Sequence, residues 1–141
     1  MTSLAPGTVL PPFAMHDIDL AQITEFMDLM GDVNPVHTDE ALTARLGLRG
    51  PVAQGPASLA YVINMLIAWR ADGFLERLEF RFRDTVTVGD TVTAGGVVQT
   101  VEDIEGGELV QCGVSLELQT GAEVLSGAAS MRLPAAAPAE S

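Results

Sequence analysis

The stretch ASLAYVINMLIAWRADG, residues 57–73, decides the fold. Its large residues are mostly apolar, and at helical spacing they fall on nearly every side of a helix: Leu59, Val62, Ile63, Met65, Leu66, Ile67 and Trp69. Pro56 suits the first turn of such a helix, where its missing N–H would have no partner. A helix that is apolar all round is buried, and this one is shorter than the ~20 residues that span a membrane. The rest of the chain must therefore surround it.

The second half of the chain predicts strands that could surround this helix. Residues 78–83 alternate, with Leu78, Phe80 and Phe82 on one face and charged residues on the other. Glycine-containing turns at residues 89–90 and 106–107 separate further strands, and residues 122–133 close the series. Helices followed by consecutive strands favour an α+β fold in which a curved, mostly antiparallel sheet surrounds the long helix. The inward positions of the strand after the second turn are Val110, Cys112, Val114, Leu116 and Leu118.

Composition limits the possible functions. The 141 residues suit one domain, which we expect over residues 1–134 with a frayed tail over 135–141. A net charge of -12 disfavours binding to nucleic acid and to anionic membranes. No apolar run is long enough to span a bilayer, and the first residues lack the basic region of a signal peptide. Because Cys112 is the only cysteine, no disulfide can form within the chain, so we expect a cytoplasmic location.

A first helix is predicted to begin after Asp19. Asp19 and Gln22 have the spacing of a capping box, and Gly31 is a natural terminator. A shorter helix should follow over residues 39–46, capped by Asp39. The apolar face of the first helix comprises Ile23, Phe26, Met27 and Met30.

The stretch GDVNPVHTDEA, residues 31–41, follows the first helix and contains a candidate acid/base site. Asp32, Asn34 and His37 lie close together in sequence, and Pro35 stiffens the backbone between them. A carboxylate and a histidine could together activate a water molecule. The same residue types also cap helices and form turns, so the residues alone favour a structural role. A metal site is poorly supported, because no cysteine and no second histidine lies nearby.

The loop AQGPAS, residues 53–58, leads into the long helix and is a second candidate feature. The Gly55 N–H and the helix N-terminus could stabilise negative charge that develops on a carbonyl oxygen. The competing interpretation is an ordinary helix start with a proline, and the loop by itself favours that interpretation.

Taken together, FMDLMGDVNPVHTDEALTARLGL (residues 26–48) and VAQGPASLAYVINML (residues 52–66) resemble the MaoC-like hot-dog family. This family includes (R)-specific enoyl-CoA hydratases and 3-hydroxyacyl-thioester dehydratases. The pattern G-D-x-N-P-x-H-x-D-x-x-A carries the resemblance, which extends to a leading strand near residues 7–13 and to the later strands. The resemblance implies a single hot-dog domain, in which an antiparallel sheet wraps a long helix.

The resemblance also implies roles for individual residues. Asp32 and His37 would be the catalytic pair, holding a water that adds to a trans-2-enoyl-CoA thioester to give an (R)-3-hydroxyacyl-CoA, or removing water in the reverse direction. Asn34 would support the loop or the water. Gly55 N–H, with the Ser58 hydroxyl as a further donor, would form the oxyanion hole. No metal or redox cofactor is expected, and coenzyme A would arrive as part of the substrate.

The second motif departs from the family pattern. Members often carry a His-Gly-Met-like segment where this chain has Gln54, Gly55 and Pro56, and Pro56 has no N–H to donate. We expect Gln54 and Pro56 to contact substrate. The departure leaves open a second hypothesis, a non-catalytic or half-active subunit that binds acyl thioesters within a heteromer. A hot-dog thioesterase ranks last, because residues 56–69 contain no carboxylate.

Partners and substrate contacts follow from the same resemblance. Since the family usually dimerises, we expect a homodimer or a heteromer with another hot-dog chain. Arg81 and Arg83 could contact the phosphates of coenzyme A, or could instead pair with Glu76 and Glu79. Met65, Leu66, Trp69 and Phe74 could line the pocket for the acyl tail. At such positions, side chains more commonly fill the core.

Overall fold

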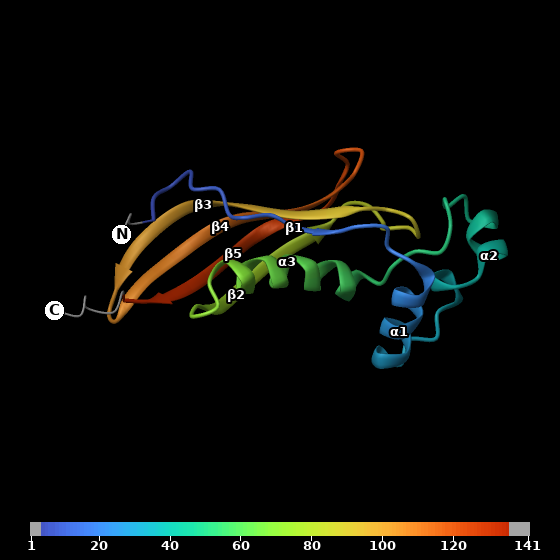
Figure 1. The fold of residues 1–141 in the computed structure, drawn as a ribbon, viewed down its shortest axis with the longest axis horizontal. Coiled ribbons are helices and arrows are strands. Elements are labelled where there is room, and N and C mark those ends of the chain that lie inside the picture. The colour runs from blue at the N-terminus through green and yellow to red at the C-terminus, as the bar shows by residue number, and fades with distance from the viewer. Residues whose placement is uncertain (1–3, 136–141) are drawn as a thin grey trace.

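Helices come first along the chain and the main strands follow (Figure 1). The helical elements are α1 (Leu20–Met30), the short 3-10 helix η1 (Pro35–His37), α2 (Glu40–Arg45) and α3 (Gly55–Trp69). The strands are β1 (Phe13–Met15), β2 (Phe74–Phe82), β3 (Val92–Ile104), β4 (Gly107–Leu118) and β5 (Glu123–Pro134). This computed structural model describes residues 4–135, so the tail expected over 135–141 lies outside the described residues except for Ala135.

The strands form one curved sheet in the order β1-β3-β4-β5-β2, and each neighbouring pair is antiparallel. The sheet extends along one side of α3 (Figure 1). Gly106 adopts the left-handed conformation, at φ 82°, in the tight turn between β3 and β4. The α+β class and the hot-dog arrangement predicted from the sequence are confirmed.

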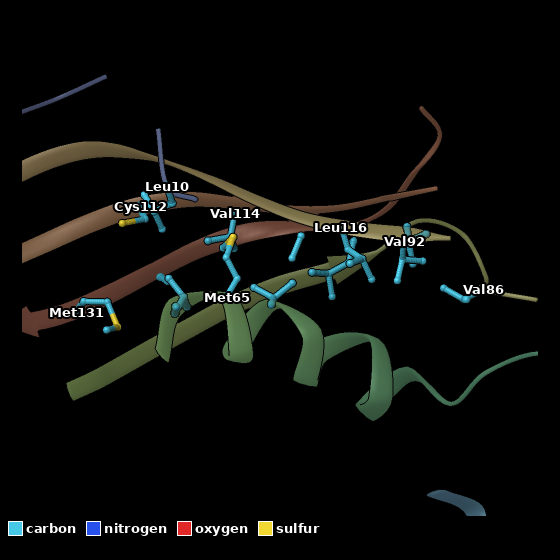
Figure 2. Close-up of a cluster of buried hydrophobic side chains, with 14 of the residues drawn as sticks. Leu10, Met65, Val86, Val92, Cys112, Val114, Leu116 and Met131 are labelled. Atoms are coloured by element: carbon cyan, nitrogen blue, oxygen red, sulfur yellow. The ribbon is translucent and has the colours of Figure 1, made fainter. Parts of the chain in front are cut away.

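The hydrophobic core lies between α3 and the inner face of the sheet (Figure 2). The five β4 positions that alternation predicts to be inward are all buried. From α3, Met65 is 1% exposed and Leu66 is 0% exposed, so both belong to the core and not to an acyl pocket. Trp69 packs against the same core, whereas Phe74 is 66% exposed. Of the two alternatives for these residues, the core is therefore correct for Met65, Leu66 and Trp69.

The sheet wraps one side of α3, and part of the helix is exposed in the single chain. Val62, Met65 and Leu66 face the sheet and are buried, but Ile67 is 53% exposed and Asn64 is also exposed. The chain supplies one sheet, and one sheet covers one side of a helix. Apolar surface of α3 is thus left open within the described residues.

Strand β2 lies at an edge of the sheet, and its apolar face extends beyond the core. Phe80 and Phe82 are 41% and 46% exposed, and their rings meet edge to face with centroids 5.3 Å apart. The register with β5 shifts between Leu75 and Arg77. An exposed edge with aromatic side chains is a surface that another chain can cover.

The helix boundaries agree closely with the sequence. The Asp19 side chain accepts from Gln22 N at 2.7 Å, and Gln22 Oε1 accepts from Asp19 N at 3.0 Å, which completes the capping box. Gly31 ends α1 at φ 67°. Of the predicted apolar face, only Ile23 is buried, and Met30 is 56% exposed. Helix α1 is therefore attached more loosely than its sequence predicts.

The leading strand is shorter than predicted. Strand β1 begins at Phe13, and Val9 forms only an isolated bridge with Val97. Pro11 and Pro12 lie between them and have no N–H to donate to a ladder.

Candidate active site

The turn after α1 holds Asp32 in a defined position. Asp32 Oδ1 accepts from Asn34 N at 2.9 Å. The Asn34 side chain in turn accepts from Val36 N at 3.1 Å and caps η1, which begins with Pro35. Asn34 therefore supports the loop, one of its two expected roles. Because Asn34 N donates to Oδ1 of Asp32, the Oδ2 atom can accept from another partner.

The His37 ring lies between a backbone carbonyl and that carboxylate. Nδ1 lies 2.7 Å from Val52 O, and Nε2 lies 3.0 Å from Asp32 Oδ2. His37 is 8% exposed, whereas the Asp32 side chain is 34% exposed. The structure thus brings together the two side chains that the sequence singled out, with the histidine on the inside and the carboxylate toward solvent.

These two contacts determine where hydrogen atoms lie. A carbonyl oxygen only accepts, so Nδ1 carries a hydrogen and donates to Val52 O. Nε2 and Asp32 Oδ2 can form a hydrogen bond only if a hydrogen lies between them, either on the imidazolium or on the carboxylic acid. The pair can therefore release one proton at this contact and take up another.

The N-terminus of α3 leaves one backbone donor free. Ala57 N and Ser58 N both donate to Gln54 O, at 3.1 Å and 3.3 Å, and Pro56 has no N–H. Within residues 4–135, the Gly55 N–H has no hydrogen-bond partner. Ser58 is buried in the first turn, at 3% exposure, and Pro56 is exposed. A single N–H at a positive helix end is available to an oxygen with developing negative charge.

Gly55 lies against the aromatic end of β2. A Cβ added to Gly55 would lie 3.0 Å from Phe82 Cζ, so the absence of a side chain allows this close approach. Because side chains alternate along a strand, Arg81 leaves β2 on the face opposite to Phe82. Together with Arg83 it borders a shallow depression on the sheet surface. The structure does not bring the two arginines to the Asp32–His37 pair of the same chain.

The alternative, in which these arginines pair with Glu76 and Glu79, is wrong. Glu79 pairs with Arg77, and Glu76 pairs with Arg132 at 2.8 Å. Arg83 instead contacts Ser126 Oγ at 2.8 Å and Glu123 at 3.3 Å. Both partners of Arg83 lie in β5, which sequence spacing along β2 could not reveal.

An apolar cavity of about 260 Å³ lies between α1 and α3. Helix α1 contributes Ile23, Phe26 and Leu29 to its lining, and α3 contributes Ala57, Ala60 and Tyr61. Partial burial raises the pKa of the Tyr61 hydroxyl. The sequence does not predict this cavity, because the cavity depends on how two helices pack. The available signal was a pair of small residues, Ala57 and Ala60, one turn apart on α3.

The described residues show no other centre that suits a bound ion. Among residues 4–135, no group of three or more His, Cys, Asp or Glu side chains lies close enough together to hold a metal. In the same range, no helix is long and apolar enough to cross a membrane.

A curved antiparallel sheet that packs along one long helix is a hot-dog domain. Here the loop before that helix also carries the Asp32–His37 pair. Residues 5–120 match the family described as MaoC like domain. The chain belongs to this family. A comparison of the sequence with curated proteins finds no match.

Solved structures share the fold. The (R)-hydratase from A. caviae, involved in PHA biosynthesis, is similar with a TM-score of 0.83 and 24% identity, covering 95% of this chain and 100% of that chain. The ChsH1-ChsH2 complex from Mycobacterium tuberculosis is similar with a TM-score of 0.80 and 20% identity, covering 93% and 99%. The C-terminally truncated HadBC complex from the same organism, a 3R-hydroxyacyl-ACP dehydratase, gives a TM-score of 0.71 and 17% identity, covering 93% and 99%.

Proposed function

We propose that this protein hydrates trans-2-enoyl-CoA thioesters to (R)-3-hydroxyacyl-CoA and catalyses the reverse dehydration. The observation that carries the proposal is the 3.0 Å contact between Asp32 Oδ2 and His37 Nε2, with Val52 O holding the far side of the ring. Family membership supports the same class of reaction, and one similar fold belongs to an (R)-hydratase.

The chemistry needs one group to take a proton and one to give a proton. In hydration, the oxygen of water bonds to C3, and the pair takes the proton that this water loses. The electrons of the double bond shift toward the thioester, whose oxygen gains negative charge beside the Gly55 N–H. C2 then takes the proton held between Nε2 and Oδ2. The pair ends with as many protons as it had at the start, so no metal or redox cofactor is required.

Coenzyme A enters the proposal as the carrier of the acyl group. Arg81 and Arg83 remain candidates for its phosphates, because both carry permanent positive charge at the surface. They lie on the face of the sheet opposite to Phe82, so they could contact the phosphates only if the carrier extends around the edge of β2. Gln54 and Pro56 would flank the thioester at the start of α3.

A second chain is part of the proposal. The exposed aromatic edge of β2 and the open side of α3 near Ile67 would both be covered in a homodimer or in a heteromer with another hot-dog chain. Two of the similar structures are complexes named for two components. If this chain is instead the acyl-binding member of such a heteromer, the missing N–H of Pro56 is the feature that favours that role. We place the protein in the cytoplasm, in keeping with its single cysteine, which is buried as a free thiol.

The experiment is a panel assay of hydration. Purified protein is given trans-2-enoyl-CoA substrates with short, medium, branched and ring-bearing acyl groups, and loss of the conjugated enoyl absorbance is followed. Asp32→Asn keeps the shape of the side chain but removes its basicity, and Asp28→Asn, an exposed carboxylate on α1, is the matched control. We expect turnover in the parent and in Asp28→Asn, and a fall of at least ~100-fold in Asp32→Asn. A folded parent that is silent across the panel would contradict the enzymatic proposal and favour the acyl-binding subunit.

A further inference from the structure

The cavity between α1 and α3 has apolar walls and one polar atom without a partner. Gln54 lies in its lining and is only 3% exposed. Gln54 Nε2 donates to the backbone oxygen of Ile23 at 3.1 Å. Within the part of the chain that the structure describes, Gln54 Oε1 is buried and has no hydrogen-bond partner. Gln54, a residue of the cavity lining, thus has a covered hydrogen-bond acceptor that no group among the described residues uses.

The orientation of this amide follows from its one bond. Ile23 O can only accept, so the NH₂ group must face it, and turning the amide over would bring two oxygens together. The acceptor therefore stays on the other side of the amide. A buried acceptor without a donor costs free energy, which a ligand that supplies the donor would recover.

The other groups at the cavity indicate what kind of donor would fit. Glu25 is the charged residue in the lining, and the described lining contains no arginine and no histidine. An anionic group would be repelled by Glu25 and would find no counter-ion, so the donor must be neutral, a hydroxyl or an amide N–H. The volume of about 260 Å³ lies near the lower end of small-ligand pockets, about 300 Å³. It suits a short or medium chain better than a fused ring system.

The cavity begins beside the candidate active site, because Gln54 and Ala57, on either side of Gly55 and Pro56 in the chain, both belong to its lining. Gln54 lies between Val52, whose oxygen holds the His37 ring, and Gly55, whose N–H is free. Asp32 N donates to Met27 O at 3.0 Å, which joins the loop that carries Asp32 to the last turn of α1. A chain attached to a thioester at Gly55 would therefore have this cavity as the adjacent apolar space.

We propose that this cavity holds the acyl chain of the substrate, and that Gln54 is a specificity-determining residue whose Oε1 accepts a hydrogen bond from a hydroxyl or N–H on that chain. The inference rests on the proposed function, since it takes the acyl thioester as ligand. Oε1 is covered by neighbouring atoms, so side chains of the lining must shift slightly to admit the donor.

The test compares three ligands that differ only at the end of the acyl chain. Saturated acyl-CoA thioesters of matched length carry a terminal methyl, a terminal hydroxyl or a terminal methyl ether, each over a series of chain lengths. The hydroxyl can donate, the ether can only accept, and the alkyl chain can do neither. Because these thioesters have no double bond to hydrate, calorimetric titration measures binding alone. We expect the best hydroxylated ligand to bind the parent about 10-fold more tightly than either matched ligand, equivalent to about 1.4 kcal/mol.

Two variants assign the preference to the correct polar group. Gln54→Met keeps the length of the side chain and removes the acceptor, so the preference should fall below about 2-fold. Gln99→Met makes the same change at an exposed glutamine of β3, outside the cavity lining, and should retain the preference. Circular dichroism shows whether each variant folds, and if Gln54→Met does not, the methyl ether still distinguishes a required donor from general polarity.

The outcomes separate this inference from the proposed function. Equal binding of the three ligands by the parent, or a preference that survives in Gln54→Met or disappears in Gln99→Met, overturns the inference. Turnover of enoyl-CoA without any ligand preference leaves the hydratase proposal in place and removes only this inference. A clear preference without turnover supports the cavity assignment in an acyl-binding subunit. If no acyl-CoA binds, both proposals fail.

Discussion

Arg49 and Asp90 form an ion pair with two hydrogen bonds across 41 positions of sequence, with Nη1 3.0 Å from Oδ1 and Nη2 2.8 Å from Oδ2. The same carboxylate accepts from Thr87 N at 2.9 Å and from Gln119 Nε2 at 2.9 Å. Asp90 is 2% exposed. It therefore joins the loop that leads to α3 with the turn before β3 and the turn after β4, and it helps to position the N-terminus of α3.

Acid should weaken the fold through Asp90. Burial raises the pKa of Asp90, but hydrogen bonds from Arg49, Gln119 and the Thr87 N–H more than offset this and lower it from 3.8 to about 2. The native state thus favours the ionised form, so its stabilisation is present above pH 3.8 and is lost as the pH falls toward 2. We expect a loss of about 2 kcal/mol in the free energy of unfolding over this interval.

Urea unfolding at a series of pH values measures this loss. Asp90→Asn should lower stability at neutral pH by about 3 kcal/mol, because it leaves buried donors poorly paired, and should flatten the dependence between pH 3.8 and 2. Asp103→Asn, an exposed carboxylate on β3, is the control and should leave the parent profile unchanged. A profile for Asp90→Asn that parallels the parent would show that other carboxylates cause the acid sensitivity.

His37 should tolerate loss of its contact with Asp32 better than loss of its contacts with both Asp32 and Val52 O. In His37→Asn, the amide NH₂ can still donate to Val52 O but cannot reach Asp32. This variant should unfold within about 1 kcal/mol of the parent and lose at least ~100-fold in kcat on any enoyl-CoA that the parent hydrates. His37→Ala loses both contacts and should be less stable than His37→Asn. If His37→Asn retains activity, the ring acts only as a loop anchor.

The fold could be predicted from the sequence because each strand carries its own signal. Alternation in β4 and glycine at the β3–β4 turn are local features, and both are confirmed. The exposure of Ile67 could not be predicted in this way. Hydrophobicity indicates that a surface needs to be covered but does not tell whether the same chain or another chain covers it.

The candidate site could be predicted only as far as its side chains carry chemistry. Residue types and short spacing identify Asp32 and His37 as a candidate pair, but only the family resemblance favours that interpretation over a structural role. The partner on the other side of the ring is the backbone oxygen of Val52, and a backbone atom leaves no mark in the sequence. The sequence predicts only that Asp90 lies in a turn. Its partner Arg49 is 41 positions away, so their ion pair leaves no local signal. The orphaned oxygen of Gln54 depends in the same way on the packing of α1 against α3.

Two glycines in the sheet should differ sharply in their tolerance of alanine. A Cβ on Gly127 would lie 1.9 Å from Glu79 O, a backbone atom of the paired strand β2. A Cβ on Gly113 would lie 2.8 Å from Gln99 Nε2, the mobile end of a long side chain. Gly127→Ala should therefore cost at least ~3 kcal/mol or separate β2 from β5, whereas Gly113→Ala should cost less than ~1 kcal/mol. Similar denaturation midpoints for the two variants would contradict this difference.

The edge of β2 should be the contact through which this chain associates. Phe80 on β2 and Val97 on β3 are almost equally exposed, at 41% and 42%, but only Phe80 lies on an edge strand. We expect light scattering to give the parent a mass of twice 14.8 kDa. Phe80→Glu places a charge on the edge and should shift the protein to the single-chain mass or weaken association at least ~10-fold, whereas Val97→Glu should not. A parent that is already a single chain would exclude the homodimer and leave a heteromer as the form in which α3 and β2 are covered. If Val97→Glu dissociates the dimer and Phe80→Glu does not, the contact lies on the outer face of the sheet.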